Sequence, residues 1–301
     1  MTQFSISDVA FTGFAVVRHR PRAVLVWVVA LVLISGSYSA IVTTQFGPVM
    51  LQMSSLSSTQ RQDPAQAMAL LNQLAPLYAV SLLYSLIIYP FLFATMNRAV
   101  LRPKDSAFGY IRFGADEFRQ LGLVLMYMGL ILASWIGATI IGTIVAIAIG
   151  AATQQAVLGL FITLGLLIVA YIYFGVRLSL ASAETFASGK ISLFGSWTLT
   201  RGRFWPVFGA YFLATMLFVI VALLGTLVVV AISAAMGGGQ DLAAAFLHPQ
   251  SNPAPLFSPA RIAQVILSAA LSAITWPLVM TPAPAIYKAI VADRSSVADV
   301  F

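Results

Sequence analysis

The sequence predicts an all-α protein that crosses a membrane six times, and three observations lead to this fold class. First, 60% of the 301 residues are hydrophobic and only 8% are charged, whereas soluble domains average about 45–50% apolar and about 25% charged residues. Second, the apolar residues form long runs. Third, the basic residues gather on one side of these runs. So few charges cannot cover a soluble protein of this size, and we treat residues 1–301 as a single membrane domain.

Six runs are long enough to cross a bilayer, because a spanning helix takes about 20 mostly apolar residues. The third, fifth and sixth runs are longer than the roughly 30 Å hydrocarbon core requires, so these helices are expected to tilt, kink or project beyond the lipid. Pro90, Pro277, Pro282 and Pro284 are the expected kink points. The six runs are Ala23–Phe46, Leu77–Thr95, Leu121–Ala152, Val157–Val176, Val207–Met236 and Ile262–Ile290.

Signals for helix starts and ends lie in the loops on the far side of the runs. Asp63 followed by Pro64 predicts a short separate helix that ends near Leu74, because an N-cap acid and a proline at the first position begin helices. The run of glycines at 237–239 is expected to end the fifth span. Ser258, followed by proline, is expected to cap the sixth.

The basic residues predict the orientation. With six spans, the N-terminus, segments 96–120 and 177–206, and the C-terminal tail lie on the same side. They hold 14 of the 16 basic residues, since only Arg61 and Arg261 fall on the other side. Cytoplasmic loops are enriched in lysine and arginine, which predicts a multi-pass protein of the bacterial inner membrane with both termini in the cytoplasm. The same distribution assigns the excess positive charge to anionic lipid headgroups and not to nucleic acid.

Three segments on the basic side resemble one another. FTGFAVVRHRP, RFGADEFRQLG and SWTLTRGRFWP each combine aromatic residues with an arginine and then a turn residue, directly before an odd-numbered span. This pattern favours three repeats of an interfacial helix plus a transmembrane hairpin, at 4–105, 106–190 and 191–292. Interface chemistry that is common to membrane proteins is the alternative explanation.

The interfacial helices have specific sequence signals. Ser5 and Asp8 form a capping box for the first helix. In the second segment, Arg112, Asp116 and Glu117 are expected to pair with one another on a solvated face. The opposite face of that predicted helix is an apolar stripe at helical spacing, made of Phe108, Ile111, Ala115 and Phe118.

The stretch Gly175–Phe208, GVRLSLASAETFASGKISLFGSWTLTRGRFWPVF, resembles a segment of one family of bacterial polytopic proteins. These are related to the membrane domain of glycerophosphodiester phosphodiesterases and to the YciC-like inner-membrane proteins. The similar elements are Arg177-Leu178, Lys190, Ser196-Trp197 and the run TRGRFW that starts at Thr200. In relatives with phosphodiesterase activity, a separate soluble domain carries the catalysis. The resemblance therefore implies a helical inner-membrane domain that meets lipid, and it implies no activity for this chain.

The predicted spans lack the groups that catalysis or ion coupling would need. All nine carboxylates lie outside them, whereas an intramembrane acid usually marks a proton relay or an ion site. His19 and His248 are predicted on opposite sides, so neither meets a serine inside the lipid. The sequence has no cysteine, no clustered metal ligands and no nucleotide-binding motif. We therefore expect no enzyme, no metal and no cofactor.

Cationic side chains at the inner membrane boundary remain as the candidate site. Arginine binds phosphate through two parallel hydrogen bonds, so these residues are expected to bind anionic lipid headgroups. The alternative is that they only anchor helix ends. The leading interpretation is a non-enzymatic integral membrane protein that binds lipid headgroups or a membrane partner through a basic, aromatic cytoplasmic face. The candidate residues are Arg18, Arg119, Arg177, Lys190, Arg201 and Arg203.

A channel, or a transporter of lipid or small molecules with its pathway between the repeats, is the alternative function. Long, proline-kinked spans and the hydroxyls of Thr139 and Thr143 favour it. The third span also has small residues four positions apart, such as Ala133 with Gly137 and Ala138 with Gly142. This spacing predicts close helix packing, either within the chain or in a homo-oligomer.

Overall fold

The computed structural model describes residues 4–50, 64–153, 156–236 and 258–298. Every regular element within these ranges is helical, and six helices are long and apolar enough to cross a membrane. The predicted fold class is therefore confirmed, and the chain is a multi-pass membrane protein. Asp63, His248, Arg61 and the glycines at 237–239 lie outside the described residues.

Each predicted span corresponds to a long helix. In chain order these are α3 (Pro21–Ile41) with a following π-helical turn η1 (Val42–Phe46), α6 (Pro64–Leu101), α7 (Ala115–Thr153), α8 (Ala156–Leu178), α11 (Phe204–Ala235) and α13 (Pro259–Met280), which α14 (Pro282–Ala298) continues. The side chain of Ser258 accepts a hydrogen bond from the Arg261 amide at 3.2 Å, so the predicted cap of the sixth span is confirmed.

One boundary prediction is wrong. The separate outer helix that was expected to end near Leu74 is instead the first part of α6, which is 38 residues long and contains Pro76 and Pro90. A proline inside a helix removes one hydrogen bond, but it does not end α6. In the sixth span, α13 ends before Thr281 and Pro282 begins α14, so the kink expected at Pro282 is confirmed.

Short helices gather at one end of the molecule. They are α1 (Ile6–Ala10), α2 (Thr12–His19), a 3-10 turn η2 (Ala107–Tyr110), α9 (Ala181–Ser188) and α10 (Gly195–Leu199). The Oγ of Ser5 accepts a hydrogen bond from the amide of Asp8 at 3.3 Å, so the predicted cap of the first helix is confirmed. We call this end, formed by the short helices, α14 and the adjoining ends of the long helices, the basic end.

The predicted amphipathic helix from Phe108 to Phe118 does not form. Phe108, Gly109 and Tyr110 have positive φ angles of 49°, 64° and 68°, and α7 begins only at Ala115. The left-handed turn docks on α3: the Trp27 indole donates a hydrogen bond to the Gly109 carbonyl at 2.6 Å. A Cβ on Gly109 would stand 3.0 Å from the side chain of Val26, so this close approach favours glycine.

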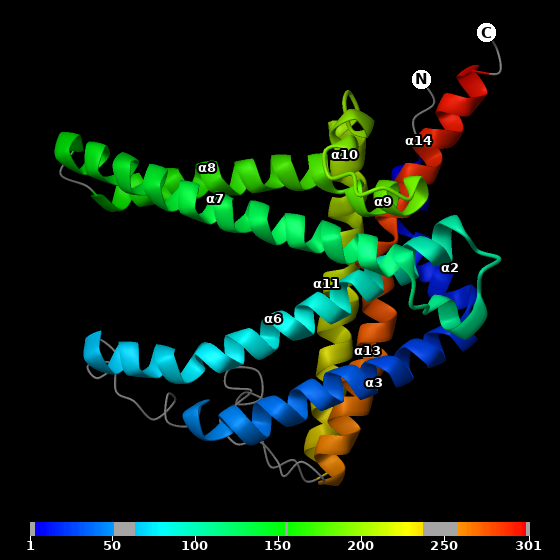
Figure 1. The fold of residues 1–301 in the computed structure, drawn as a ribbon, viewed down its shortest axis with the longest axis horizontal. Helices are drawn as coiled ribbons and strands as arrows, with labels where there is room; N and C mark the ends of the chain where they lie inside the picture. Colours follow the sequence, from blue (N-terminus) through cyan, green and yellow to red (C-terminus); the bar gives the residue numbers. More distant parts are fainter. Residues whose placement is uncertain (1–3, 51–63, 154–155, 237–257, 299–301) are drawn as a thin grey trace.

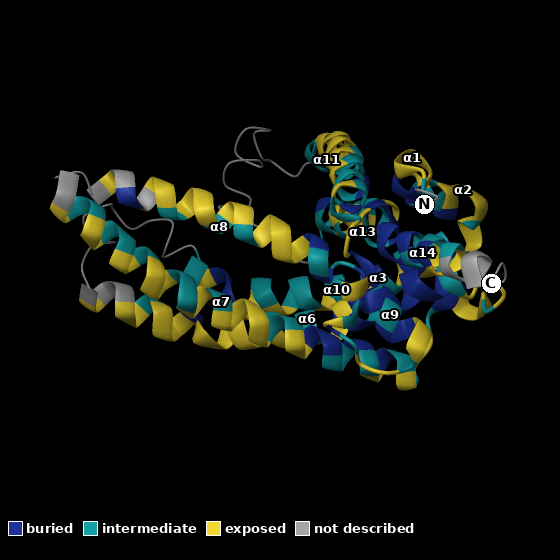
Figure 2. Cartoon of the chain, turned by 90° about the horizontal axis from the view of Figure 1, so that it is seen from above, coloured by how far each residue is buried: buried dark blue, intermediate teal, exposed yellow. Residues whose placement is uncertain are grey.

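The long helices converge at the basic end and diverge away from it. In Figure 1, α7 and α8 leave this end as one hairpin and lie apart from α3 and α6 over most of their length, while α11 and α13 pack together as a second pair. Figure 2 shows the buried residues gathered around α9, α14 and the adjoining part of α3, whereas α8 and the outer part of α7 are mostly exposed. The ordered core of the protein therefore lies at the basic end.

The three predicted repeats stay a prediction. Helices α1 and α2 precede the first span and α10 precedes the fifth, but the segment before the third is the left-handed turn described above. Helix α9, which follows α8, packs against α6, α7 and α14. The three segments before the odd spans thus share composition and position but differ in backbone form.

Close packing of α2 on α13 yields a first testable prediction. A Cβ on Gly13 would stand 2.6 Å from the Cα of Leu278, so even alanine forces the two backbones apart. We expect Gly13→Ala to lower the free energy of unfolding by about 1–3 kcal/mol, as overpacked cores do. Thermal unfolding in detergent measures this. Gly129→Ala in α7, which meets no atom within 4 Å, is the control and should unfold at or above the wild-type temperature; equal effects of the two substitutions would contradict the packing.

Candidate functional site

An ion pair that is withdrawn from solvent connects the ends of α6 and α7. The Nη2 of Arg98 lies 2.8 Å from the Oε1 of Glu117, and the two side chains are only 3% and 8% exposed, respectively. The other terminal nitrogen of Arg98 donates to the Tyr110 carbonyl at 2.6 Å. The acid lies in the first turn of α7 and the base in the last turn of α6, which are the positions that each helix dipole favours.

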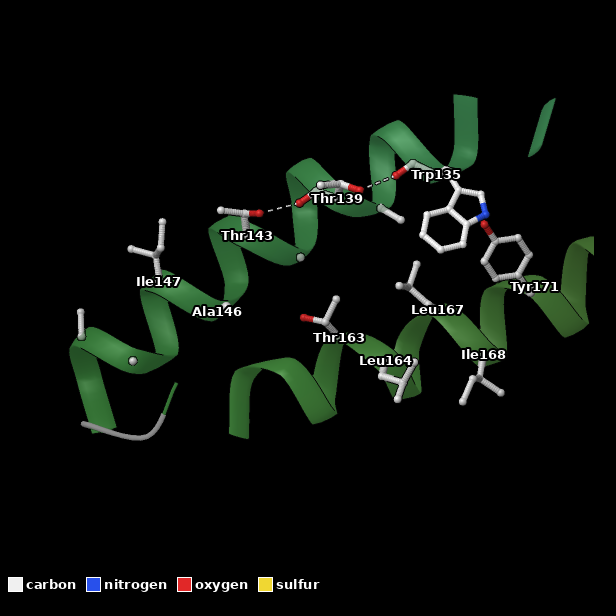
Figure 3. A pocket seen from close by; sticks show the side chains of 14 residues that line it. Trp135, Thr139, Thr143, Ala146, Ile147, Thr163, Leu164, Leu167, Ile168 and Tyr171 are labelled. Atoms are coloured by element: carbon white, nitrogen blue, oxygen red, sulfur yellow. Dashed lines mark hydrogen bonds between the residues drawn. The ribbon is translucent and has the colours of Figure 1, made fainter. Parts of the chain in front are cut away.

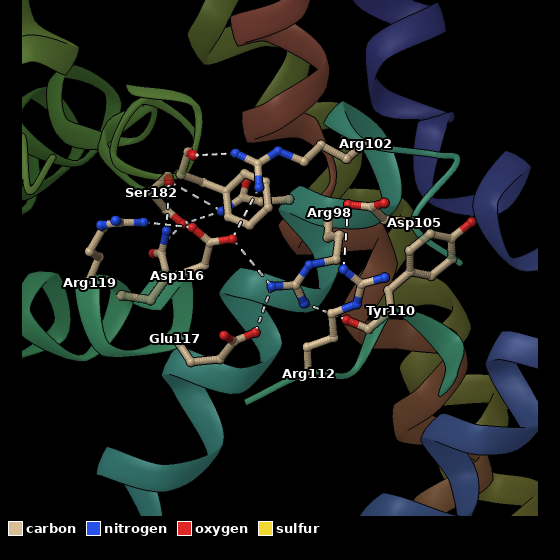
Figure 4. Close-up of polar contacts among 12 residues, drawn as sticks. Arg98, Arg102, Asp105, Tyr110, Arg112, Asp116, Glu117, Arg119 and Ser182 are labelled. Carbon is tan, nitrogen blue, oxygen red and sulfur yellow. Dashed lines mark hydrogen bonds and ion pairs between the residues drawn. The ribbon is translucent and has the colours of Figure 1, made fainter. Parts of the chain in front are cut away.

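Asp116 extends this pair into a network (Figure 4). Its carboxylate lies 2.8 Å from Arg119, 3.1 Å from Arg102 and 3.5 Å from Arg98. The expected pairing among Arg112, Asp116 and Glu117 on a solvated face is therefore wrong. Because α7 starts after Arg112, that side chain is not on the same helix as the two acids, and it lies 3.7 Å from Asp105 instead.

Neutral hydrogen bonds fix α9 onto the same two helix ends. The Asn97 amide of α6 donates to the Ser182 Oγ at 2.8 Å, the Ser182 hydroxyl donates to the Gln120 Oε1 at 2.9 Å, and the Gln120 amide donates to the Ser182 carbonyl at 2.9 Å. All three side chains are buried. A buried network in which these groups are paired holds its elements in one arrangement, and we interpret it as a structural clamp between α6, α7 and α9.

The six candidate residues have three different environments. Arg119 is paired with Asp116, and Arg203 lies 3.2 Å from Asp293 of α14. Arg18, Lys190 and Arg201 are exposed, and none of the three forms an ion pair with any residue in the described ranges. The guanidinium of Arg177 lies over aromatic rings.

Arg119 lies close to Gly189, the residue that precedes Lys190. The guanidinium carbon of Arg119 lies 3.9 Å from the position that a Cβ on Gly189 would take, directly before Lys190. No contact in the described part of the structure joins Arg18, at the end of α2, to the other five. The structure therefore places Arg119 beside the residue that precedes Lys190 and leaves Arg18 apart.

Aromatic rings surround Arg177. Its guanidinium lies over the rings of Tyr173, at 5.3 Å, and Trp197, at 5.5 Å, while Phe204 stacks on Tyr173 at 5.7 Å. The Nε and one terminal nitrogen of Arg177 are buried and have no hydrogen-bond partner among the described residues. The Ser196 hydroxyl donates to the Arg177 carbonyl at 2.7 Å. Residues from the end of α8, from α10 and from the start of α11 thus form one corner around this arginine.

Large aromatic side chains are also exposed at the basic end. Five of them are between 63% and 86% exposed, which is unusual for rings that face water and is typical of the boundary between lipid and water. They come from the 3-10 turn, the stretch between that turn and α7, the start of α7, the loop before α10 and the start of α11. The five are Phe108, Phe113, Phe118, Phe194 and Trp205.

One small residue of the third span, Gly142, packs closely within the chain. A Cβ on Gly142 would stand 2.9 Å from the side chain of Thr163 in α8, and one on Gly159 of α8 would stand 2.9 Å from the Cα of Ala146 in α7. At these positions the two helices of the hairpin approach each other closely. Gly137, in contrast, meets no atom within 4 Å and stays available to lipid or another chain.

Within the described ranges, no group of three or more His, Cys, Asp or Glu side chains is placed to hold a metal ion. The ring of His19 contacts the Ala15 carbonyl of its own helix at 2.8 Å. Comparisons with protein-family models, with curated proteins and with solved structures find no match for this chain. The resemblance of Gly175–Phe208 to the phosphodiesterase-linked membrane domains therefore stays a prediction, and the site has to be interpreted from its own geometry.

The residues of the clamp were not predicted from the sequence. Asn97, Arg98, Gln120 and Ser182 lie at the boundaries of apolar runs, where polar residues are expected in any membrane protein. Only the chain path shows that they face inward. The presence of two amides within three residues of a run boundary is the one signal that could have singled them out.

The buried pair yields a second prediction. Glu117→Leu leaves the Arg98 guanidinium without its closest acid, and breaking a buried pair costs about 3–5 kcal/mol of unfolding free energy. Adding Arg98→Met to this variant should restore part of the loss, because two well-packed apolar side chains avoid the desolvation cost. Thermal unfolding in detergent tests both variants.

The exposed pair between Asp105 and Arg112 provides the matched control. Both side chains are more than 40% exposed, and such pairs contribute about 0–1 kcal/mol. Asp105→Asn should therefore leave the unfolding temperature close to that of the wild type. If Glu117→Leu is as mild as Asp105→Asn, the buried pair of Arg98 and Glu117 does not stabilise the basic end.

Proposed function

We propose that this protein is a non-catalytic, multi-pass protein of the bacterial inner membrane that recognises anionic lipid headgroups at its basic end, with that end facing the cytoplasm. The main support for this proposal is that only some of the cations at the basic end are paired with acids. The acids neutralise Arg98, Arg102, Arg119 and Arg203, while other cations remain exposed beside exposed aromatic rings. A cation near an anionic membrane surface contributes about 1 kcal/mol.

The structure divides the candidate residues by their availability. Arg18, Arg177, Lys190 and Arg201 have no acid within ion-pair distance among the described residues, so their charge is available to a phosphate. Arg119 and Arg203 are already paired, and we assign them to the stability of the fold. A membrane-protein partner with an acidic surface would use the same four cations and is an outcome of the test below.

A channel or transporter has weaker support. The hydroxyls of Thr139 and Thr143, which the sequence offered for a pathway, donate to the carbonyls of Trp135 and Thr139 on their own helix at 2.9 and 2.8 Å. Hydroxyls bonded in this way are not available to solvate an ion or a polar substrate. We therefore make no second functional proposal.

The exposed cations yield a third prediction. The variant Arg18→Gln/Lys190→Gln/Arg201→Gln should prefer phosphatidylglycerol over phosphatidylcholine less than the wild type, by up to about fivefold for each charge removed. Energy transfer from the tryptophans to labelled lipids in nanodiscs measures this preference, which should also weaken at high salt.

The control removes one exposed pair at the same end without changing net charge: Asp105→Asn/Arg112→Gln should keep the wild-type preference. An unchanged lipid preference in the triple variant, with folding intact, would contradict headgroup recognition by these cations. If that variant instead loses a co-purifying membrane protein, the partner is a protein.

The orientation can be tested directly because the natural chain has no cysteine. Lys190→Cys should be protected from a membrane-impermeant maleimide in spheroplasts and should react in inverted vesicles. Gln45→Cys, which is exposed in η1 near the opposite end, should react in spheroplasts. The reverse pattern would place the basic end outside the cell.

A further inference from the structure

An apolar groove lies between α7 and α8 (Figure 3). It has a volume of about 1080 Å³ and extends from Trp135 and Tyr171 to Gly150. Figure 3 shows the hydroxyls of Thr139 and Thr143 directed back at their own helix. The Thr163 hydroxyl likewise donates to the Gly159 carbonyl at 2.9 Å. With these hydroxyls satisfied, the lining calls for a hydrocarbon occupant and not for a polar one.

A second groove of about 450 Å³ adjoins the first and extends toward the basic end. The two share Leu167 and Tyr171, and the second reaches Leu178 and Ser179 at the end of α8. From residue 167 to residue 178 is 11 positions, which at 1.5 Å per residue is about 16 Å along the helix. This length matches one leaflet of a hydrocarbon core that is about 30 Å thick.

Arg177 lies beside residues that line the second groove, although it does not line the groove itself. Phe174 lines this groove, and Arg177 lies three residues further along the same helix, where side chains are neighbours. The ring of Phe174 contacts Trp197 at 5.9 Å, and the Arg177 guanidinium lies over that same Trp197 ring. Phe174 and Trp197 thus connect the groove to the arginine.

The hydrogen bonding of the Arg177 guanidinium is also incomplete. Two of its nitrogens are buried with no hydrogen-bond partner in the described part of the chain, and buried donors are almost always paired in folded proteins. A phosphate supplies several strong acceptor oxygens in the geometry that the planar fork of arginine matches. A phosphate at this position would satisfy the unpaired nitrogens.

We propose that Arg177 and the groove between α7 and α8 bind one anionic phospholipid of the inner leaflet, with its phosphate on Arg177 and an acyl chain along the second groove. This inference rests on the proposed function, because it takes the basic end to face that leaflet. A cationic mouth above an apolar groove one leaflet deep complements an anionic amphiphile in both charge and length. A transmembrane helix of a partner would match the apolar groove but would leave the two guanidinium nitrogens unpaired.

Two glycines of α8 provide a matched pair of variants. Gly175 lines the second groove, and a Cβ there meets no atom within 4 Å, so Gly175→Leu adds an apolar side chain at the groove. Gly165 also meets no atom within 4 Å and lines neither groove, so Gly165→Leu adds the same side chain elsewhere on the helix. Both substitutions replace a helical glycine, which favours the folded helix, and thermal unfolding checks that both variants fold.

The experiment is native mass spectrometry of each full-length variant after exchange into equal amounts of phosphatidylglycerol and phosphatidylcholine. We expect the wild type and Gly165→Leu to retain one phosphatidylglycerol and Gly175→Leu to lose it. Arg177→Gln should still retain a lipid, with the ratio of phosphatidylglycerol to phosphatidylcholine lowered by about fivefold, the contribution of one cation near an anionic phosphate.

Three other results would each overturn this inference. If the wild type prefers phosphatidylglycerol but neither Gly175→Leu nor Arg177→Gln changes the bound lipid, headgroup recognition stands and its site lies elsewhere on the basic end. If the wild type shows no preference between the two lipids, the proposed function fails as well. If Gly175→Leu converts a dimer into a monomer, the groove is an interface between two copies of the chain.

Discussion

The pairing of a few acids with arginines at the basic end is the interaction on which the rest of the structure depends. The chain has nine carboxylates and 16 basic residues, and two of those acids, Asp116 and Glu117, lie together in the first turn of α7. They contact Arg98, Arg102 and Arg119 from two helices. Breaking a buried pair leaves an uncompensated charge, so these contacts hold the helix ends in one arrangement and allow the long hairpins to diverge into the lipid.

This use of the acids also determines which cations remain for recognition. The acids of α7 neutralise Arg98, Arg102 and Arg119. Arg203 is paired with Asp293 of α14. What remains is an exposed set near aromatic rings, together with Arg177, which is enclosed by Tyr173 and Trp197 and lacks partners for two nitrogens among the described residues. One end of the molecule thus serves both stability and, in our proposal, the recognition of lipid, with different arginines for each role.

The sequence predicted much of the fold because the hydrophobic effect leaves a clear record in apolar runs: each of the six predicted spans corresponds to a long helix or, for the sixth, to α13 and α14 together. It predicted less of the connections. The turn at Phe108–Tyr110 has left-handed backbone angles, and Gly109 in this turn packs closely against α3. Helical spacing alone cannot reveal such a tertiary contact. A helix end was expected near Leu74, yet α6 continues through Pro76, because a proline inside a helix can be tolerated without ending it.

The candidate site was predictable in its chemistry and not in its geometry. Composition located the cations at one membrane boundary, but only the chain path shows that Arg119 is paired and that Phe174, one turn before Arg177, lines a groove. A structure of the protein in nanodiscs that contain phosphatidylglycerol tests the whole account most directly. The account predicts elongated density from Leu167 to Leu178 between α7 and α8, ending in a headgroup at Arg177. Density for a helix of another chain in that groove, or an empty groove with lipid bound only at the opposite end, would contradict it.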